Sequence, residues 1–158
     1  MAVALSACKK NTTQLEDDVD AIKDYLSANG ISAQETNKVY YQVITEGDGE
    51  QCAAGDTVAI KYKVATINSP DKIFDQNEGN KATVFFLPTV LGNTSASGAP
   101  IYGLQFGLTT MKENGISKFY VPSSYAYGSQ AVGPDSISYA NLIFEVELCE
   151  IIRRDKKH

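Results

Sequence analysis

The sequence has 158 residues and a formal net charge of −5 at pH 7. This length suits one ordinary domain with a tail and is too short for two full hydrophobic cores. The surplus of acidic residues argues against nucleic acid as a partner, because phosphate binding needs a basic face. The 43% hydrophobic content is typical of a globular protein. No run reaches the roughly 18 apolar residues that a transmembrane helix needs.

The first residues resemble the end of a bacterial lipoprotein signal. Leu5-Ser6-Ala7-Cys8 has the form of a lipobox, in which a small residue precedes a cysteine that becomes lipidated. No positive charge precedes Cys8, so residues 1–7 are interpreted as the end of an apolar region whose start is missing. The alternative is a disordered N-terminus with a stray thiol. The polar run after the cysteine favours the first interpretation, with residues 1–12 as residual signal and tether.

A helix is predicted directly after the tether. Thr13-Gln14-Leu15-Glu16 is a capping box, whose side chains satisfy free backbone N–H groups at a helix start. Asn29-Gly30 is a typical C-terminal stop. We expect residues 31–37 to form a linker, and the apolar face of the helix to pack on the domain, on a partner or on a second copy. This face carries Leu15, Val19, Ile22 and Leu26.

From Val39 onward the pattern is that of β-structure. Apolar residues recur at every second position after Gly55-Asp56 and again after Asn141, which predicts strands with one buried face. The stretch 88–100 is rich in Gly, Ser, Asn and Thr and is interpreted as a long loop. Several antiparallel strands around one short helix make an α+β fold. We predict strands at 39–45, 58–64, 72–75, 82–87, 116–121 and 141–152, and the helix at 101–111.

The cysteines limit the redox chemistry of the chain. If Cys8 carries lipid, Cys52 and Cys149 remain, an even number in an oxidising compartment. These two could be bridged if the ends of their strands are neighbours, and two free thiols are at least as compatible with the sequence. Neither lies in a Cys-x-x-Cys pattern, so no redox or zinc role is expected.

The last third of the chain predicts a cleft. Tyr125-Ala126-Tyr127-Gly128 forms a loop after an apolar strand, and the final strand turns Phe144 and its alternate neighbours inward. A β core with aromatic side chains at its edge and almost no ionisable side chains nearby is typical of a binding cleft for an apolar peptide. The only histidine is His158, and no Cys, Asp or Glu cluster has ligand spacing. We therefore expect no metal ion, no other cofactor and no hydrolase chemistry.

Seven short motifs lie in order along the chain: Glu46-Gly47-Asp48-Gly49, Gly55-Asp56-Thr57-Val58, Lys61-Tyr62, Ile73-Phe74-Asp75, Gly103-x-x-x-Gly107-Leu108-x-x-Met111, Tyr125-Ala126-Tyr127-Gly128 and 142–148. Together they resemble the FKBP-type peptidyl-prolyl isomerases over about 39–152. The resemblance implies a curled antiparallel sheet wrapped on one short helix, with an N-terminal helical extension. It divides the chain into a helix and linker at 13–37, an isomerase domain at 38–153 and a basic tail at 154–158.

The family resemblance also implies an aromatic site without a nucleophile. Tyr62, Phe74 and Phe144 would form walls around a proline ring. Ile101 would donate its backbone N–H to a substrate carbonyl, and Tyr127 its hydroxyl. The catalytic set implied by the family is Tyr62, Phe74, Asp75, Ile101, Tyr127 and Phe144.

Asp75 would orient polar neighbours, with Tyr62 as its partner, and would not act as a general base because isomerisation transfers no proton. Leu104 falls where the family usually has a tryptophan, and Val84 where an aromatic residue is common. The segment 136–139 replaces an Ile-Pro-Pro element. The residues expected to contact substrate are Val84, Leu104, Ile137 and Tyr139.

The resemblance implies a prolyl isomerase that assists the folding of exported proteins and binds Xaa-Pro segments. A helix behind a lipobox-like cysteine is similar to secreted lipoprotein members of the family in Bacteroides-like bacteria. This implies a lipid anchor at Cys8 and a periplasmic or outer-membrane location in the cell envelope. Macrolide inhibitors are a further ligand class, and the N-terminal helix offers a route to a homodimer. The alternative is a non-catalytic peptide-binding module or chaperone that uses the same cleft.

Overall fold

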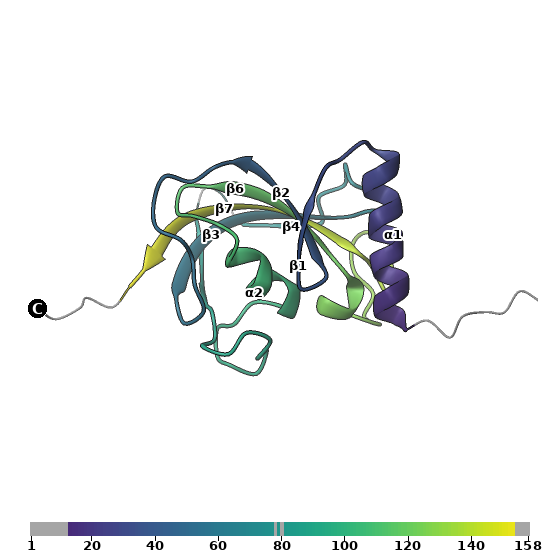
Figure 1. Ribbon diagram of the computed structural model, residues 1–158. Coiled ribbons are helices and arrows are strands. Elements are labelled where there is room, and N and C mark those ends of the chain that lie inside the picture. Colours follow the sequence, from purple (N-terminus) through teal and green to yellow (C-terminus); the bar gives the residue numbers. More distant parts are fainter. Residues whose placement is uncertain (1–12, 78, 80, 154–158) are drawn as a thin grey trace, which may run out of the picture.

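The computed structural model describes residues 13–77, 79 and 81–153. A seven-stranded antiparallel sheet curls over a short helix, α2, and a longer helix, α1, lies across one end of the sheet (Figure 1). The strand order is β1-β2-β6-β7-β3-β4, and β5 also pairs with β3. This confirms the predicted α+β architecture. The elements are α1 (Gln14–Ala28), β1 (Gln34–Thr36), β2 (Val39–Thr45), β3 (Thr57–Thr66), β4 (Asp75–Gln76), β5 (Thr83–Phe86), α2 (Tyr102–Leu108), β6 (Ile116–Val121), the 3-10 helix η1 (Ser123–Tyr125) and β7 (Leu142–Ile152).

Helix α1 begins at the predicted capping box. The N–H of Glu16 donates to Thr13 Oγ1 at 3.3 Å, and the N–H of Thr13 donates to Glu16 Oε2 at 2.7 Å. The helix ends at Asn29, and Gly30 follows in the left-handed region with φ +62°, where glycine is favoured. In the part of the chain that the structure describes, no helix has both the length and the apolar content to span a bilayer.

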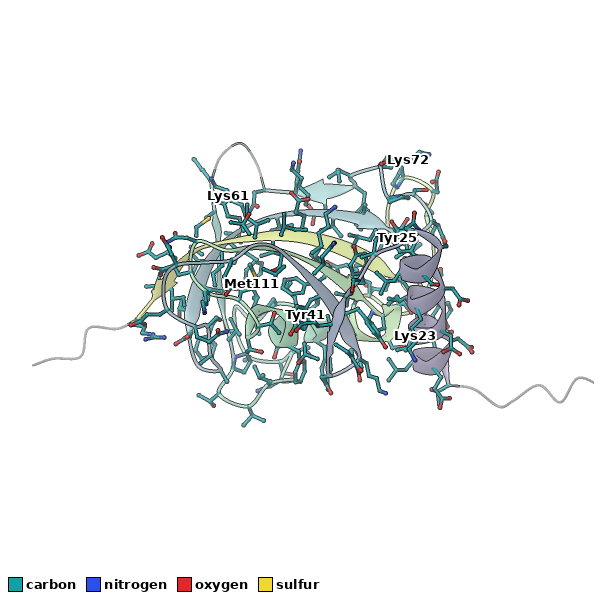
Figure 2. All side chains as sticks on the ribbon, turned by 45° about the horizontal axis from the view of Figure 1, so that its top comes forward. Lys23, Tyr25, Tyr41, Lys61, Lys72 and Met111 are labelled. Atoms are coloured by element: carbon teal, nitrogen blue, oxygen red, sulfur yellow. The ribbon has the colours of Figure 1, made fainter. Side chains whose placement is uncertain are left out.

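The apolar face of α1 packs on its own domain. Ile22 and Leu26 are buried against Tyr120 of β6. Tyr25, labelled in Figure 2, packs against the same cluster. Its ring centroid is 6.1 Å from that of Tyr120. Leu15, predicted on this stripe, is only half-buried. Of the three packing partners considered for this face, the structure shows the domain itself.

The long pairing of β3 with β7 forms the centre of the sheet. It runs from Thr57 opposite Ile152 to Thr66 opposite Leu142. Every second side chain of β7 from Leu142 to Leu148 is buried, which confirms the predicted inward face. These side chains share one continuous core with residues of β3, β6 and α2. Figure 2 shows the long sheet passing over this core.

Strand β1 and the segment 72–75 differ from the prediction. Strand β1 lies in the expected linker and pairs with β2 through Asn37 and Lys38, whose φ angles are +46° and +68°. A two-residue turn in this left-handed conformation matches the twist of paired strands, so the linker folds back as a hairpin. The predicted strand 72–75 is wrong for all but its last residue. The N–H of Lys72 donates to the carbonyl of Ser69 at 3.0 Å, which closes a turn at 69–72, and residues 72–74 that follow are irregular.

Helix α2 lies directly against β6 because two glycines, one turn apart, face the strand. A Cβ atom on Gly103 would lie 2.4 Å from Val121 Cγ1, and one on Gly107 would lie 2.9 Å from the ring of Phe119. Only glycine permits backbone to approach this closely. The helix is shorter than the predicted 101–111, because the two threonines after it bond back to helix carbonyls and end it there.

Cys52 and Cys149 are both free thiols. The structure therefore selects the second of the two alternatives left open by the sequence. Burial, assisted by the nearby Asp56 carboxylate, raises the pKa of Cys52 to about 12. Burial also raises the pKa of Cys149, which is half-buried. Cys8, the expected lipidation site, lies outside the described residues.

We expect Gly103→Ala to lower the free energy of unfolding by about 1–3 kcal/mol, because the new methyl group overpacks the contact with Val121. The loss should appear even though alanine favours a helix more than glycine does. Urea unfolding measures it. The double variant with Val121→Ala should cost less than the sum of the single changes, since the clashing methyl is removed. Equal stability of Gly103→Ala and the wild type would contradict the close contact.

Candidate functional site

A small cleft of about 70 Å³ lies between α2 and the inner face of the sheet. Its lining comes from three positions in and beside α2, from four strands, and from the loop after η1. Six of the lining residues belong to the predicted site, and two were not predicted. The lining residues are Tyr62, Asp75, Phe85, Pro100, Ile101, Leu104, Tyr127 and Phe144.

The floor of the cleft is apolar and buried. Phe144 is 4% exposed and Leu104 is 3% exposed. Phe144 occupies an inward position of β7 and lies opposite Val64 of β3 and Phe119 of β6. Leu104 follows the first close-packed glycine of α2, so the tight helix–sheet contact sets its depth. The floor therefore offers a dry aliphatic and aromatic surface to an apolar ring.

Tyr62 of β3 and Phe85 of β5 form an aromatic wall. Their ring centroids are 6.5 Å apart, and the rings are tilted by 54°, a spacing typical of favourable aromatic pairs. Val84, which was predicted to contact the substrate, is 57% exposed and does not line the cleft. Neighbouring residues of a strand point to opposite faces, so Phe85 takes the inward position. Apolar residues occupy both faces of β5, so alternation alone could not identify the inward one.

The backbone of Tyr62 is held by an asparagine that sequence analysis missed. The side-chain Oδ1 of Asn77 accepts from the backbone N–H of Tyr62. Its Nδ2 donates to Thr83 Oγ1 at 2.8 Å and to the carbonyl of Ile60 at 3.3 Å. Asn77 thus joins β3 to β5 beside the aromatic wall. No sequence motif marks this role, because it depends on which strands are paired.

Tyr62, Asp75 and Tyr127 form the polar rim. Burial, then the charge of Asp75, then Tyr127 raise the pKa of Tyr62. Burial, followed by the charge of Asp75, raises the pKa of Tyr127. Both phenols therefore keep their protons well above neutral pH. They are available as hydrogen-bond donors at the mouth of an apolar pocket.

A buried glutamine positions the loop that carries Pro100 and Ile101. Gln105 is 0% exposed. Its Nε2 donates to the carbonyl of Pro100 at 3.0 Å, and its Oε1 accepts from the N–H of Gly92 at 2.9 Å. The long loop 88–100 is thereby fastened to α2. Ile101 is the N-cap of α2, and within the described part of the chain its own N–H forms no hydrogen bond.

Besides Val84, three further predicted site residues lie outside the cleft lining. Phe74 is half-buried and packs on the core. Gly133, in the loop between η1 and β7, lies against its ring. Ile137 packs on the same core. Tyr139 is 51% exposed, has φ +52°, and donates its N–H to the carbonyl of Gly128 at 2.9 Å. These residues support the loop beyond Tyr127 and contribute no wall to the cleft.

The arrangement suits binding and desolvation of a neutral group. Neither a cysteine nor a histidine lines the cleft, and its single carboxylate is Asp75. Among residues 13–77, 79 and 81–153, no group of three or more His, Cys, Asp or Glu is placed to hold a metal ion. An apolar ring on the floor would put an adjacent carbonyl beside the donors of the rim.

We expect the protein to lose stability as the pH rises above about 10, the unperturbed tyrosine value. The native state keeps protons on Tyr62 and Tyr127 at a pH where the unfolded chain has released them. Their contribution to stability is complete below that pH and falls above it. Urea unfolding at about pH 8 and about pH 11 tests this. The decrease should be smaller in the double variant Tyr62→Phe with Tyr127→Phe, and an identical decrease would contradict the assignment.

Comparisons with known proteins agree with this geometry. The family that matches residues 48–149 is the FKBP-type peptidyl-prolyl cis-trans isomerases. The chain is 31% identical over 144 residues to the peptidyl-prolyl cis-trans isomerase Mip of Chlamydia trachomatis, covering 90% of this chain and 52% of that protein. It is 27% identical over 130 residues to a probable isomerase, FkpA, of Neisseria meningitidis, covering 82% of this chain and 43% of that protein.

A solved structure supports the same relationship. The crystal structure of FkpA from Escherichia coli superposes with a TM-score of 0.64 and 27% identity, covering 87% of this chain and 60% of that chain. The chain thus spans about half the length of the curated relatives named above. The matched region contains every residue that lines the cleft.

Proposed function

Because the chain belongs to the FKBP-type peptidyl-prolyl cis-trans isomerase family, we propose that its cleft binds Xaa-Pro segments and speeds their cis–trans isomerisation. One observation carries this proposal. Tyr62, Asp75, Ile101, Tyr127 and Phe144 come from three strands and two loops, and they line one apolar cleft.

The reaction needs an environment and no nucleophile. Rotation about an Xaa-Pro bond has a barrier of about 20 kcal/mol, so the uncatalysed event takes tens of seconds. A proline ring on the floor formed by Phe144 and Leu104 would bring its amide out of water. Loss of amide resonance in the twisted state is less unfavourable there. The N–H of Ile101 and the hydroxyl of Tyr127 would then bind the carbonyls on either side of the ring.

Asp75 acts on the tyrosine hydroxyls of the rim and not on the Xaa-Pro amide of the substrate. After burial, its charge is the next cause that raises the pKa of both Tyr62 and Tyr127. We propose that it orients these donors. No proton transfer is assigned to it, because the isomerisation moves no proton.

A non-catalytic peptide-binding module is the second candidate function. It is favoured by Leu104, which lies on the floor where the family usually has a tryptophan. Leucine removes a flat surface for the ring and weakens the selection of one twisted geometry. The two candidates differ in one measurable property, since only the enzyme accelerates exchange.

We further propose that the protein assists exported proteins at the bacterial cell envelope, with Cys8 as a lipid anchor and 1–12 as its tether. The lipobox-like sequence supports this. Macrolide inhibitors would occupy the same cleft. The apolar face of α1 is buried against its own domain, so a homodimer would have to use the outer face of the helix. The isomerase domain is assigned to 38–153.

Exchange spectroscopy on an Xaa-Pro peptide tests the reaction. The wild type should accelerate exchange, and Tyr127→Phe should reduce the rate roughly three- to tenfold, as expected for one lost hydrogen bond. Tyr41→Phe is the matched control, because the hydroxyl of Tyr41 bonds to Gln34 on β1, outside the cleft lining. Asp75→Ala should also be slower than the wild type. Binding of the peptide without any acceleration would select the second candidate function.

A further inference from the structure

Asp18 is an acidic side chain that the structure buries almost completely. It lies on α1, outside the matched region 48–149, and is 2% exposed. Its Oδ2 accepts three hydrogen bonds, from Ser123 Oγ at 2.7 Å, Ser124 Oγ at 2.9 Å and Ser124 N at 3.0 Å. Its Oδ1 accepts a fourth, from Gln14 Nε2 at 2.9 Å. A carboxylate of the N-terminal helix is therefore bonded to a segment about a hundred residues later.

The segment that Asp18 holds leads directly to Tyr127 of the cleft. Ser123 begins η1, and its carbonyl accepts from the N–H of Ala126 at 3.0 Å and from the N–H of Gly128 at 2.8 Å. These two N–H groups flank Tyr127 in the sequence. The side chain of one serine thus bonds to Asp18, while its carbonyl fixes the backbone on both sides of the cleft tyrosine.

A buried amide closes the network. Asn141 accepts from the N–H of Ser123 at 2.9 Å through Oδ1, and its Nδ2 lies 3.5 Å from the carbonyl of Asp18. The carbonyl of Asn141 accepts from the N–H of Ile67 at 3.0 Å. Asn141 immediately precedes β7, the strand that carries Phe144. Helix α1, the loop after η1 that carries Tyr127, and strand β7 therefore meet at one cluster of polar side chains.

Apolar packing alone would hold α1 on the sheet, since Ile22 and Leu26 are already buried against Tyr120. Burying a carboxylate is costly, and the cost is offset only when several donors surround it in good geometry. The hydrogen bonds of Asp18 specify one orientation and one register of α1 on the sheet. Rotating or sliding the helix by one residue would break them while leaving an apolar contact possible.

We propose that Asp18 is a positioning residue of the peptide site, which acts through Ser123 to fix Tyr127. This inference rests on the proposed function of the cleft. Helix α1 would then contribute to the geometry of the site, although it lies outside residues 48–149, the stretch that matches the family.

The test compares Asp18→Ala, Asp18→Asn and Ser123→Ala with the wild type. Asp24→Asn is the matched control, because it removes one charge from an exposed position of the same helix. We expect kcat/KM for an Xaa-Pro peptide to fall roughly tenfold or more in Asp18→Ala, as a small misplacement can cost. Asp18→Asn, which keeps one oxygen acceptor, should retain more activity, and Asp24→Asn should match the wild type. Circular dichroism below the unfolding transition confirms that each variant is folded, and Ser123→Ala replaces Asp18→Ala if the latter does not fold.

Two readouts separate positioning from a loss of stability. The factor by which the Asp18 or Ser123 substitution lowers kcat/KM should be at least threefold smaller when Tyr127 has already been replaced by Phe, because the two changes act on the same group. Native-state hydrogen exchange should accelerate at the N–H groups of Ala126 and Gly128, while amides in the middle of β7 keep their wild-type protection. An equal factor of loss in kcat/KM with and without Tyr127→Phe overturns the proposal. Unchanged hydrogen exchange at the N–H groups of Ala126 and Gly128 overturns it as well.

The test also separates this inference from the proposed function. If the wild-type protein binds the peptide without accelerating its exchange, the proposed reaction is wrong. The Asp18 and Ser123 variants, with and without Tyr127→Phe, are then compared by their Kd for the peptide in place of kcat/KM. If it binds no Xaa-Pro peptide at all, both the function and this inference fail. A wild type that is active, with Asp18 variants that are equally active, leaves the function intact and overturns only the role of Asp18.

Discussion

The close approach of α2 to β6 is the contact on which the cleft depends. Gly103 and Gly107 remove the side chains that would hold helix and strand apart. Leu104, next to the first glycine, is therefore pressed into the cleft floor, and Gln105 reaches the carbonyl of Pro100. A helix displaced outward by one methyl group would move the floor and the loop above it together. The depth of the cleft therefore depends on this helix–strand contact as well as on the side chains that line the floor.

Buried polar side chains then fix the irregular segments around this apolar centre. Asn77 joins β3 to β5, Gln105 holds the loop before α2, and Asp18 holds η1. Each bonds to at least one backbone N–H group, of Tyr62, Gly92 and Ser124 respectively. Apolar contacts are non-directional, whereas these hydrogen bonds require one relative placement of the segments. The rim of the cleft is made of loops, so its geometry is set largely by such anchors.

Strong local signals allowed much of the fold to be predicted. The capping box at Thr13 and the alternation of β7 act within a few residues, and both appear in the structure as expected. The cleft lining differs from the expectation where local signals were ambiguous. Apolar residues occupy both faces of β5, so Phe85 rather than Val84 lines the cleft. Phe74 was expected in the cleft wall but packs on the core outside it, in the irregular segment that precedes β4.

The sequence by itself determined the class of fold, the capped N-terminal helix and the inward face of β7, and its resemblance to the FKBP-type family supplied most of the residues that line the cleft. It could do so because periodicity, capping and glycine positions are local properties of the chain. Only the tertiary structure decided which face of β5 turns inward, that Cys52 and Cys149 remain apart, and that the acidic residue Asp18 is buried beside η1. These outcomes depend on contacts between segments far apart in the chain, and no local pattern encodes such pairings.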